Sequence, residues 1–263
     1  MALPKADLAD LEAAKALLEH QSMAAKLARV IGSPIERGLK QLPSRVQAGV
    51  HKATEKALMK ALDVAVSSLG AKGAVRPSRD KAHKLAAAAS GAAGGALGIV
   101  ALAWELPIST TLMLRSIADI AAAEGHDPRE LETKLDCLTV FGLSGEGGAD
   151  NPAESGYFAA RTALASAVTE ATKHLAKKGL AKGSAPALVR LIALIGSRFG
   201  VVVSEKAAAQ AIPILGAAGG ALINTIFIGH YQDLARGHFI VRRLEKIHGE
   251  QTVRLAWGQI PRS

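Results

Sequence analysis

Two long stretches without a charged residue constrain this chain more than any other feature. They run from Leu85 to Trp104 and from Ala207 to Gly229. A glycine inside a helix costs roughly 0.5–1 kcal/mol relative to alanine, so repeated glycines are expected where another backbone must approach closely. We therefore predict that the two runs form central helices that pack through smooth faces. Helix-spaced glycines line one face of each run: Gly91, Gly95 and Gly98 in the first, and Gly216, Gly219 and Gly220 in the second.

The rest of the chain also favours helices. Hydrophobic residues make up 49% of the sequence but aromatic residues only 3%, so the apolar mass consists of Ala, Leu, Ile and Val. Strong helix formers dominate, and no stretch sustains the alternation of apolar and polar residues that marks a strand. The predicted fold class is all-α: a compact helical bundle around two Gly/Ala-rich apolar helices.

The chain is expected to form a single domain over residues 1–263. Within it we place N-terminal helices over 1–80, a first glycine-rich unit over 81–141, a mobile loop over 142–156 and a second helical unit over 157–258. The heptapeptide GAAGGAL occurs at Gly91–Leu97 and again at Gly216–Leu222. This repeat indicates either a weak internal duplication or a shared Ala/Gly bias.

Several helices are predicted individually. We expect an unbroken helix from Leu8 to Val30, a second from about Ser44 to Leu69, and a third from Tyr157 to Lys178. Glu105-Leu106-Pro107 is expected to interrupt the first uncharged run, with a helix resuming over Ile108–Glu124. Inward-facing residues of the second helix are predicted at Val46, Val50, Ala57, Leu58, Ala61 and Leu62.

The charge balance points to an anionic partner. The net charge is +9 and the pI is about 9.8, which suits either nucleic acid or an anionic membrane surface. Basic patches with interleaved aromatic residues are absent, so we expect no nucleic acid. Charged residues near the N-terminus leave no secretory hydrophobic region there, and we predict a cytoplasmic protein. Basic residues near the first glycine run are expected to form a collar close to the membrane: Lys72, Arg76, Arg79, Lys81 and Lys84.

The uncharged runs are long enough to cross a bilayer, which takes about 20 residues. The first run holds few strongly apolar residues, and Pro213 and Asn224 oppose insertion of the second. Two alternatives stay open: buried core helices in a soluble protein or one peripheral to the inner membrane, or helices that span that membrane or insert in it reversibly.

The sequence resembles the EcsC protein family over nearly its whole length. The matching pieces include IGSPIERGLKQLP at Ile31–Pro43 and, most specifically, the stretch from Ile212 through GAAGGALIN to Gly249. Glu105 stands before Leu-Pro where the family pattern has Asp, a departure that keeps the charge. The resemblance implies a bacterial, membrane-associated helical protein, with an ABC transporter or an envelope process as its context. The resemblance also implies a peptidase label for some relatives, which the motifs of this sequence do not support. The alternative function is a hydrolase, either a peptidase or a lipid hydrolase, with an unrecognised His/Glu/Arg site.

A polar stripe on the last helix is the best candidate for a site. At 100° per residue, Asn224, Tyr231, His238 and Arg242 fall within about 40° of one another. If the glycine helices pack together, Glu105 and Arg115 approach this stripe. Arg242 is permanently charged and needs a partner, for which Glu105 is our first choice.

Three interpretations of the polar stripe remain open: a structural ion-pair network, a site for an anionic lipid headgroup, or a catalytic site. The sequence carries no metal-binding, nucleotide-binding or nucleophile motif, so we expect no cofactor and no metal. The lone Cys137 is interpreted as a small core residue. The ligand and the oligomeric state do not follow from the sequence.

Overall fold

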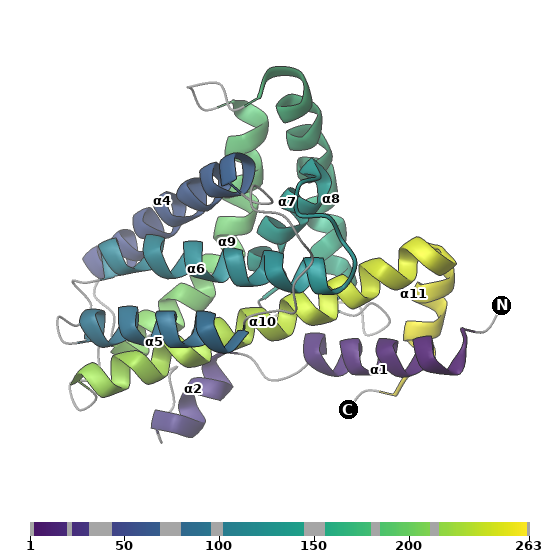
Figure 1. Ribbon diagram of the computed structural model, residues 1–263. Coiled ribbons are helices and arrows are strands. Elements are labelled where there is room, and N and C mark those ends of the chain that lie inside the picture. Colours follow the sequence, from purple (N-terminus) through teal and green to yellow (C-terminus); the bar gives the residue numbers. More distant parts are fainter. Residues whose placement is uncertain are drawn as a thin grey trace.

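The computed structural model describes residues 3–19, 23–31, 44–68, 80–95, 102–144, 156–179, 185–210 and 216–261. Every regular element within these ranges is a helix, which confirms the all-α fold class (Figure 1). The α-helices are α1 (Lys5–Glu19), α2 (Met23–Ile31), α4 (Ser44–Ser68), α5 (Asp80–Gly95), α6 (Leu102–Ala123), α7 (Leu131–Thr139), α8 (Gly156–Lys178), α9 (Pro186–Gln210), α10 (Gly216–His248) and α11 (Glu250–Gln259).

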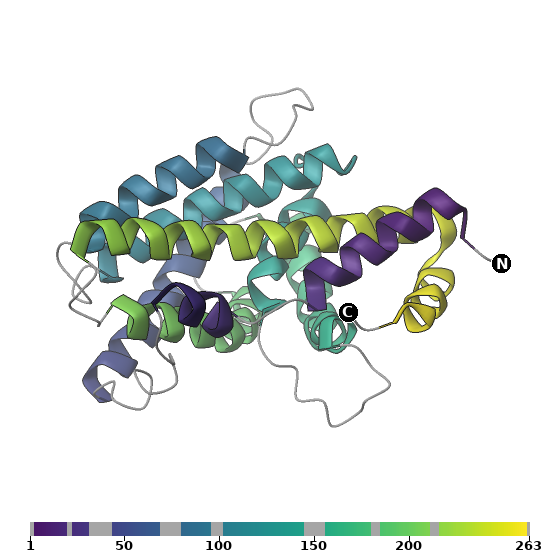
Figure 2. The same cartoon turned by 90° about the horizontal axis from the view of Figure 1, so that it is seen from below.

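Helix α10 is the long central helix of the molecule. It contains 33 residues and is therefore about 50 Å long. Helices α5 and α6 cover one side of it, and α2 and α9 lie on the opposite side (Figure 2). Helices α1 and α11 pack at its C-terminal half. Aromatic rings fill the centre of the core, where Phe199 and Tyr231 lie with ring centroids 5.6 Å apart.

The two Gly/Ala-rich helices α5 and α10 pack along one another at the centre, as predicted. They run antiparallel, so the last turn of α5 and the first turn of α10 lie at the same end of the molecule (Figures 1 and 2). The two GAAGG segments thus occupy different places, Gly91–Gly95 ending one helix and Gly216–Gly220 beginning the other. This difference does not favour an internal duplication, which stays a prediction, as does direct contact between the glycine faces. Gly98 lies outside the described residues.

Neither uncharged run forms one continuous helix. The first is divided between α5 and α6, and the second between α9 and α10. The expected break at Pro107 is wrong, because α6 begins before it and continues through it. Pro107 is the sixth residue of α6, so it removes one intrahelical hydrogen bond, and the turns on either side maintain the helix.

One helix among the described residues is long and apolar enough to cross a membrane, and it is α9. The two uncharged runs are the segments for which membrane insertion is predicted. Helix α9 contains only Ala207–Gln210 of the second run. Its apolar window is 44% buried inside the fold, and core helices of soluble proteins pass the same test. The observation is therefore weak evidence for insertion.

The N-terminal prediction of one unbroken helix is wrong. Helices α1 and α2 are separate and contact different parts of α10 (Figure 2). Helix α1 lies so close to α10 that a Cβ atom built on Gly237 would be 2.6 Å from Leu18 Cγ and 3.0 Å from the Ala14 carbonyl oxygen. A side chain at this position would push the two helices apart.

The other predicted helices are confirmed. Helix α4 begins at Ser44 and buries the expected residues, except that Val46 is only partly buried. Helix α8 matches the third prediction within one residue. Gly142, placed at the start of the expected mobile loop, is instead buried in a short 3-10 helix, where an added Cβ would lie 2.9 Å from Leu164 Cδ1. Residues 145–155 of that loop lie outside the described residues.

Candidate functional site

The residues of the predicted polar stripe fall into two separate clusters on α10. Asn224 belongs to one, and His238 and Arg242 belong to the other. His238 is 14 positions after Asn224, which corresponds to about 20 Å of helix. Tyr231 lies between the clusters. The predicted residues therefore lie along one face of α10, but they do not form a single site.

The first cluster, which we call the buried lock, consists of Glu105, Lys206 and Asn224. The Lys206 ammonium donates to both carboxylate oxygens of Glu105 at 2.9 Å, and both side chains are completely buried. The Asn224 amide donates to Glu105 Oε1 at 2.7 Å and to the Ala87 carbonyl oxygen at 3.0 Å. The buried lock thereby joins four helices, α5, α6, α9 and α10.

The buried Lys206 ammonium has two partners, the Glu105 carboxylate and the Phe227 ring. Burial lowers its pKa, and the neighbouring Glu105 carboxylate opposes that shift. Its ammonium also lies 4.6 Å from the centroid of the Phe227 ring, a cation–π distance. Because the two charges neutralise each other and the Glu105 carboxylate accepts a further hydrogen bond from Asn224, the cluster has the chemistry of a structural ion pair.

The second cluster surrounds His238 where α8 meets α10. The Tyr157 hydroxyl lies 3.0 Å from His238 Nδ1, and both side chains are buried. Arg161 donates to the two carboxylate oxygens of Glu245 at 2.7 and 3.0 Å. The Arg161 guanidinium also donates to the Tyr157 hydroxyl at 3.3 Å, so these residues form one continuous network.

Arg242 extends this network toward solvent. Its guanidinium donates to Asp136 at 3.0 Å and to Glu132 at 2.8 Å, both on α7. The predicted pair between Arg242 and Glu105 is therefore wrong. The two groups lie in different clusters, and each has a closer partner on a helix that the prediction left out, α9 for Glu105 and α7 for Arg242.

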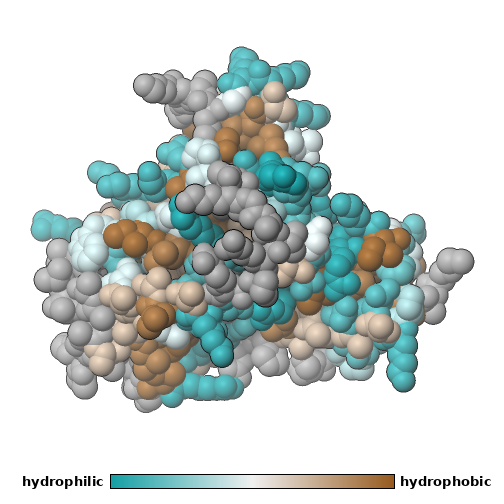
Figure 3. All heavy atoms as spheres, in the orientation of Figure 1, coloured by the Kyte–Doolittle hydropathy of each residue, from teal (hydrophilic) through white to brown (hydrophobic). Residues whose placement is uncertain are grey.

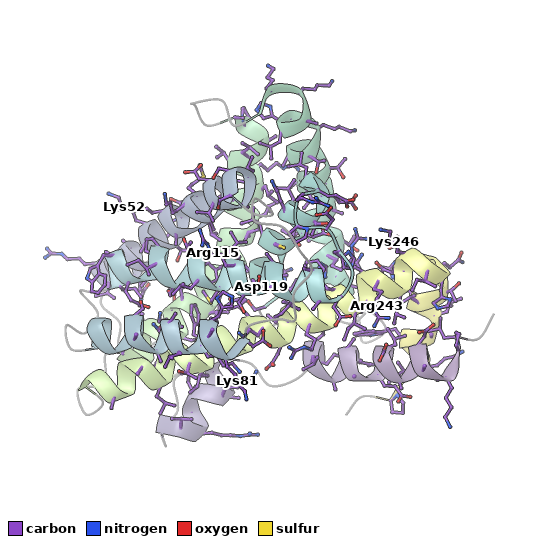
Figure 4. The ribbon with its side chains drawn as sticks, in the orientation of Figure 1. Lys52, Lys81, Arg115, Asp119, Arg243 and Lys246 are labelled. Atoms are coloured by element: carbon purple, nitrogen blue, oxygen red, sulfur yellow. The ribbon has the colours of Figure 1, made fainter. Side chains whose placement is uncertain are left out.

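The two remaining predicted residues join neither cluster. The Tyr231 hydroxyl lies 2.9 Å from the Ser144 hydroxyl in the aromatic core, and burial raises the pKa of Tyr231. Arg115 is exposed on α6 and does not approach His238 or Arg242. Figure 4 shows Arg115 one turn from Asp119, whose carboxylate lies 2.9 Å from His83 Nε2.

Four residues of the two clusters were missed from the sequence: Lys206, Tyr157, Arg161 and Glu245. Lys206 carried a usable sequence pattern, since it stands between the apolar segments Val201–Val203 and Ala207–Ala209 on one helix. Tyr157 and Arg161 are four residues apart and so share a helix face. Their partner Glu245 is 84 residues from Arg161, and only the tertiary fold brings the two together.

The described residues give no specific support for catalysis or for metal binding. Among the described residues, no three His, Cys, Asp or Glu side chains gather as metal ligands. His238 Nε2 has no hydrogen-bond partner within the described parts of the chain, but the ring is 1% exposed. The hydrolase alternative stays a prediction.

Buried histidines make stability depend on pH. Burial lowers the pKa of His230 to about 3, with Lys26 adding to the effect, and burial lowers the pKa of His238 well below its usual value. An unfolded histidine titrates near pH 6.5, so below that pH the unfolded state binds more protons. We expect the free energy of unfolding to fall between pH 7 and pH 5, measured by urea denaturation.

Two variants separate this effect from general acid sensitivity. His230→Phe keeps a ring and removes one titrating group, so its stability should depend less on pH over this range. His51→Gln removes an exposed histidine, 70% accessible, and should retain the full pH dependence. Equal pH dependence in His230→Phe and the unmodified protein would contradict the assignment.

Comparison with known proteins gives one match. A family model described as the EcsC protein family matches residues 5–244. No curated protein and no solved structure matches the chain. The matched range includes the buried lock and all of the second cluster except Glu245, which lies one position beyond it.

Proposed function

Because the chain belongs to the EcsC protein family, with a match over residues 5–244, we propose that it is a non-enzymatic accessory protein that associates with an anionic membrane surface. The proposed location is the cytoplasmic side of the inner membrane. One observation carries the proposal: exposed cations without ion-pair partners lie beside exposed apolar side chains on one face.

The cations on this face come from four helices. Lys52 of α4, Lys81 of α5, Arg115 of α6 and Lys246 of α10 are exposed, and none forms an ion pair within the described ranges. Figure 4 shows them across a single view of the molecule. Many acidic side chains, by contrast, are held in internal pairs such as Arg161–Glu245. Each such pair is neutral, so the unpaired cations carry the net positive charge of this face.

Apolar side chains are exposed among these cations. Leu85 is 74% exposed, Ile108 48% and Trp104 42%. A hydrophobic area lies over the N-terminal half of α6, with hydrophilic atoms beside it (Figure 3). Basic residues that attract anionic headgroups, next to apolar groups that enter the interface, are the combination found in peripheral membrane proteins.

Vesicle binding tests the proposal. The full chain should co-sediment with phosphatidylglycerol vesicles at 0.1 M salt and much less with phosphatidylcholine vesicles. Each basic residue near an anionic surface contributes about 1 kcal/mol, and the Debye length falls from about 10 Å at 0.1 M to about 3 Å at 1 M salt. Affinity should therefore drop at least about tenfold over this salt range. Equal binding to both vesicle types at every salt concentration would overturn the proposal.

An ABC transporter or an envelope process as the partner stays a prediction, which rests on the family resemblance alone. Partial insertion of helices into the bilayer is not needed for the proposed association, which uses residues on the surface of the fold.

A further inference from the structure

An open groove lies between α4 and α6 on the molecular surface. Its volume is about 510 Å³. Trp104 and Met59 are its large apolar residues, and they are 42% and 37% exposed. Lys56, Met59, Lys60, Asp63, Ala103, Trp104 and Pro107 line it.

The α4 wall of the groove is basic. Lys52, Lys56 and Lys60 follow one another at intervals of four residues, so they lie along one side of the helix. All three are exposed and form no ion pair with any described residue. One lining residue, Asp63, is acidic, which leaves two positive charges against one negative charge in the groove itself.

The α6 wall is apolar and rigidly supported. Trp104 immediately precedes Glu105, whose carboxylate is held inside the core by Lys206 and Asn224. The buried lock therefore fixes the first turn of α6 while the indole ring faces outward. Ile108, one turn later, extends the apolar surface and is 48% exposed.

We infer that the α4–α6 groove is the docking point for an anionic phospholipid leaflet, with the Trp104 indole at the headgroup level and the Lys56 and Lys60 ammonium groups on lipid phosphates. Tryptophan favours this depth because its ring is apolar and its N–H is polar. Phosphate complements the unpaired lysines, and the open shape suits a surface rather than an enclosed small molecule. This inference rests on the proposed function and specifies where it is carried out.

The fluorescence of Trp104 tests the depth of docking directly. The chain has two tryptophans, and Trp257 is 3% exposed and stacked against Tyr157, so it serves as an internal reference. On phosphatidylglycerol vesicles the emission should shift to shorter wavelength, and phospholipids brominated near the headgroup should quench it. Trp104→Phe should lose both responses and retain the emission of Trp257.

Substitution of the lysines tests the electrostatic contribution to vesicle binding, with a matched control. Lys56→Gln/Lys60→Gln should weaken vesicle binding about 30-fold, because two phosphate contacts are lost. The control, Lys173→Gln/Lys177→Gln, removes the same charge with the same spacing from an exposed face of α8 and should change binding less than about threefold. Asp63→Asn removes the one acidic side chain of the groove and should tighten binding about fivefold, an effect that misfolding does not imitate.

The outcomes distinguish this inference from the broader proposal. No binding to anionic vesicles by the unmodified chain overturns both. Salt-sensitive binding that leaves Trp104 fluorescence unchanged, or that the two lysine pairs affect equally, supports membrane association but overturns the groove as its location. Specific capture of a soluble acidic protein by the groove, lost in Lys56→Gln/Lys60→Gln while vesicle binding is retained, overturns the lipid assignment as well.

Discussion

Replacing Lys206 with methionine should lower the free energy of unfolding by about 3–5 kcal/mol, the cost of leaving one charge of a buried pair without its partner. The Glu105 carboxylate would then remain buried, with the Asn224 amide as its hydrogen-bond donor. Urea denaturation followed by circular dichroism measures the loss. Methionine has nearly the length of the lysine stem, so cavity formation contributes little.

The double variant Lys206→Met/Glu105→Leu should recover much of this loss, because no buried charge remains. The control is Arg190→Met, which breaks an ion pair with Glu170 at 3.3 Å whose side chains are 58% and 48% exposed. Exposed pairs contribute at most about 1 kcal/mol. Simple addition of the losses in Lys206→Met and Glu105→Leu would contradict an energetic coupling between the two residues.

The second large effect is expected at the contact between α8 and α10. Arg161→Ala removes both hydrogen bonds to Glu245, whose side chain is only 5% exposed, and the free energy of unfolding should fall by about 1.5–3 kcal/mol. The loss should be smaller than that of Lys206→Met, because Arg242 Nη1 remains 3.5 Å from the Glu245 carboxylate.

A double-mutant cycle of Arg161→Ala and Glu245→Ala measures the interaction itself. Arg129→Ala is the matched control, since Arg129 also forms a bidentate contact, with Asp127, but is 72% exposed. It should be nearly neutral. A coupling energy near zero in the first cycle would show that the Arg161–Glu245 contact does not stabilise the fold.

The sequence predicted the local structure better than the partners of individual residues. Glu105 directly follows the first uncharged run and was expected to form an ion pair, and it is completely buried. Its partner was assigned wrongly because Lys206 and Glu105 are 101 residues apart, and helix periodicity carries no information about which helices meet. Arg242 was paired wrongly for the same reason, although Glu132 and Asp136 show the four-residue spacing of an acidic helix face.

The uncharged runs show a second limit of the sequence. Each run was interpreted as a helix because it contains no charged residue, yet each is divided between two helices. A connection between buried helices can be as apolar as the helices themselves, so composition alone does not mark it. At Pro107 the error was the opposite one: a helix break was predicted because proline commonly ends helices, but Pro107 lies within α6.

The contact between the first and the last helices has a consequence for biosynthesis. Lys15 of α1 donates to the carbonyl oxygens of Trp257 and Ile260 at 3.1 and 2.8 Å, where it caps the C-terminal end of α11 across 242 residues of sequence. During translation, α1 is made before α10 and α11, the helices against which it packs. Helix α1 therefore lacks these packing partners, and its apolar residues Leu11 and Ala14 stay uncovered, until α10 and α11 have been made.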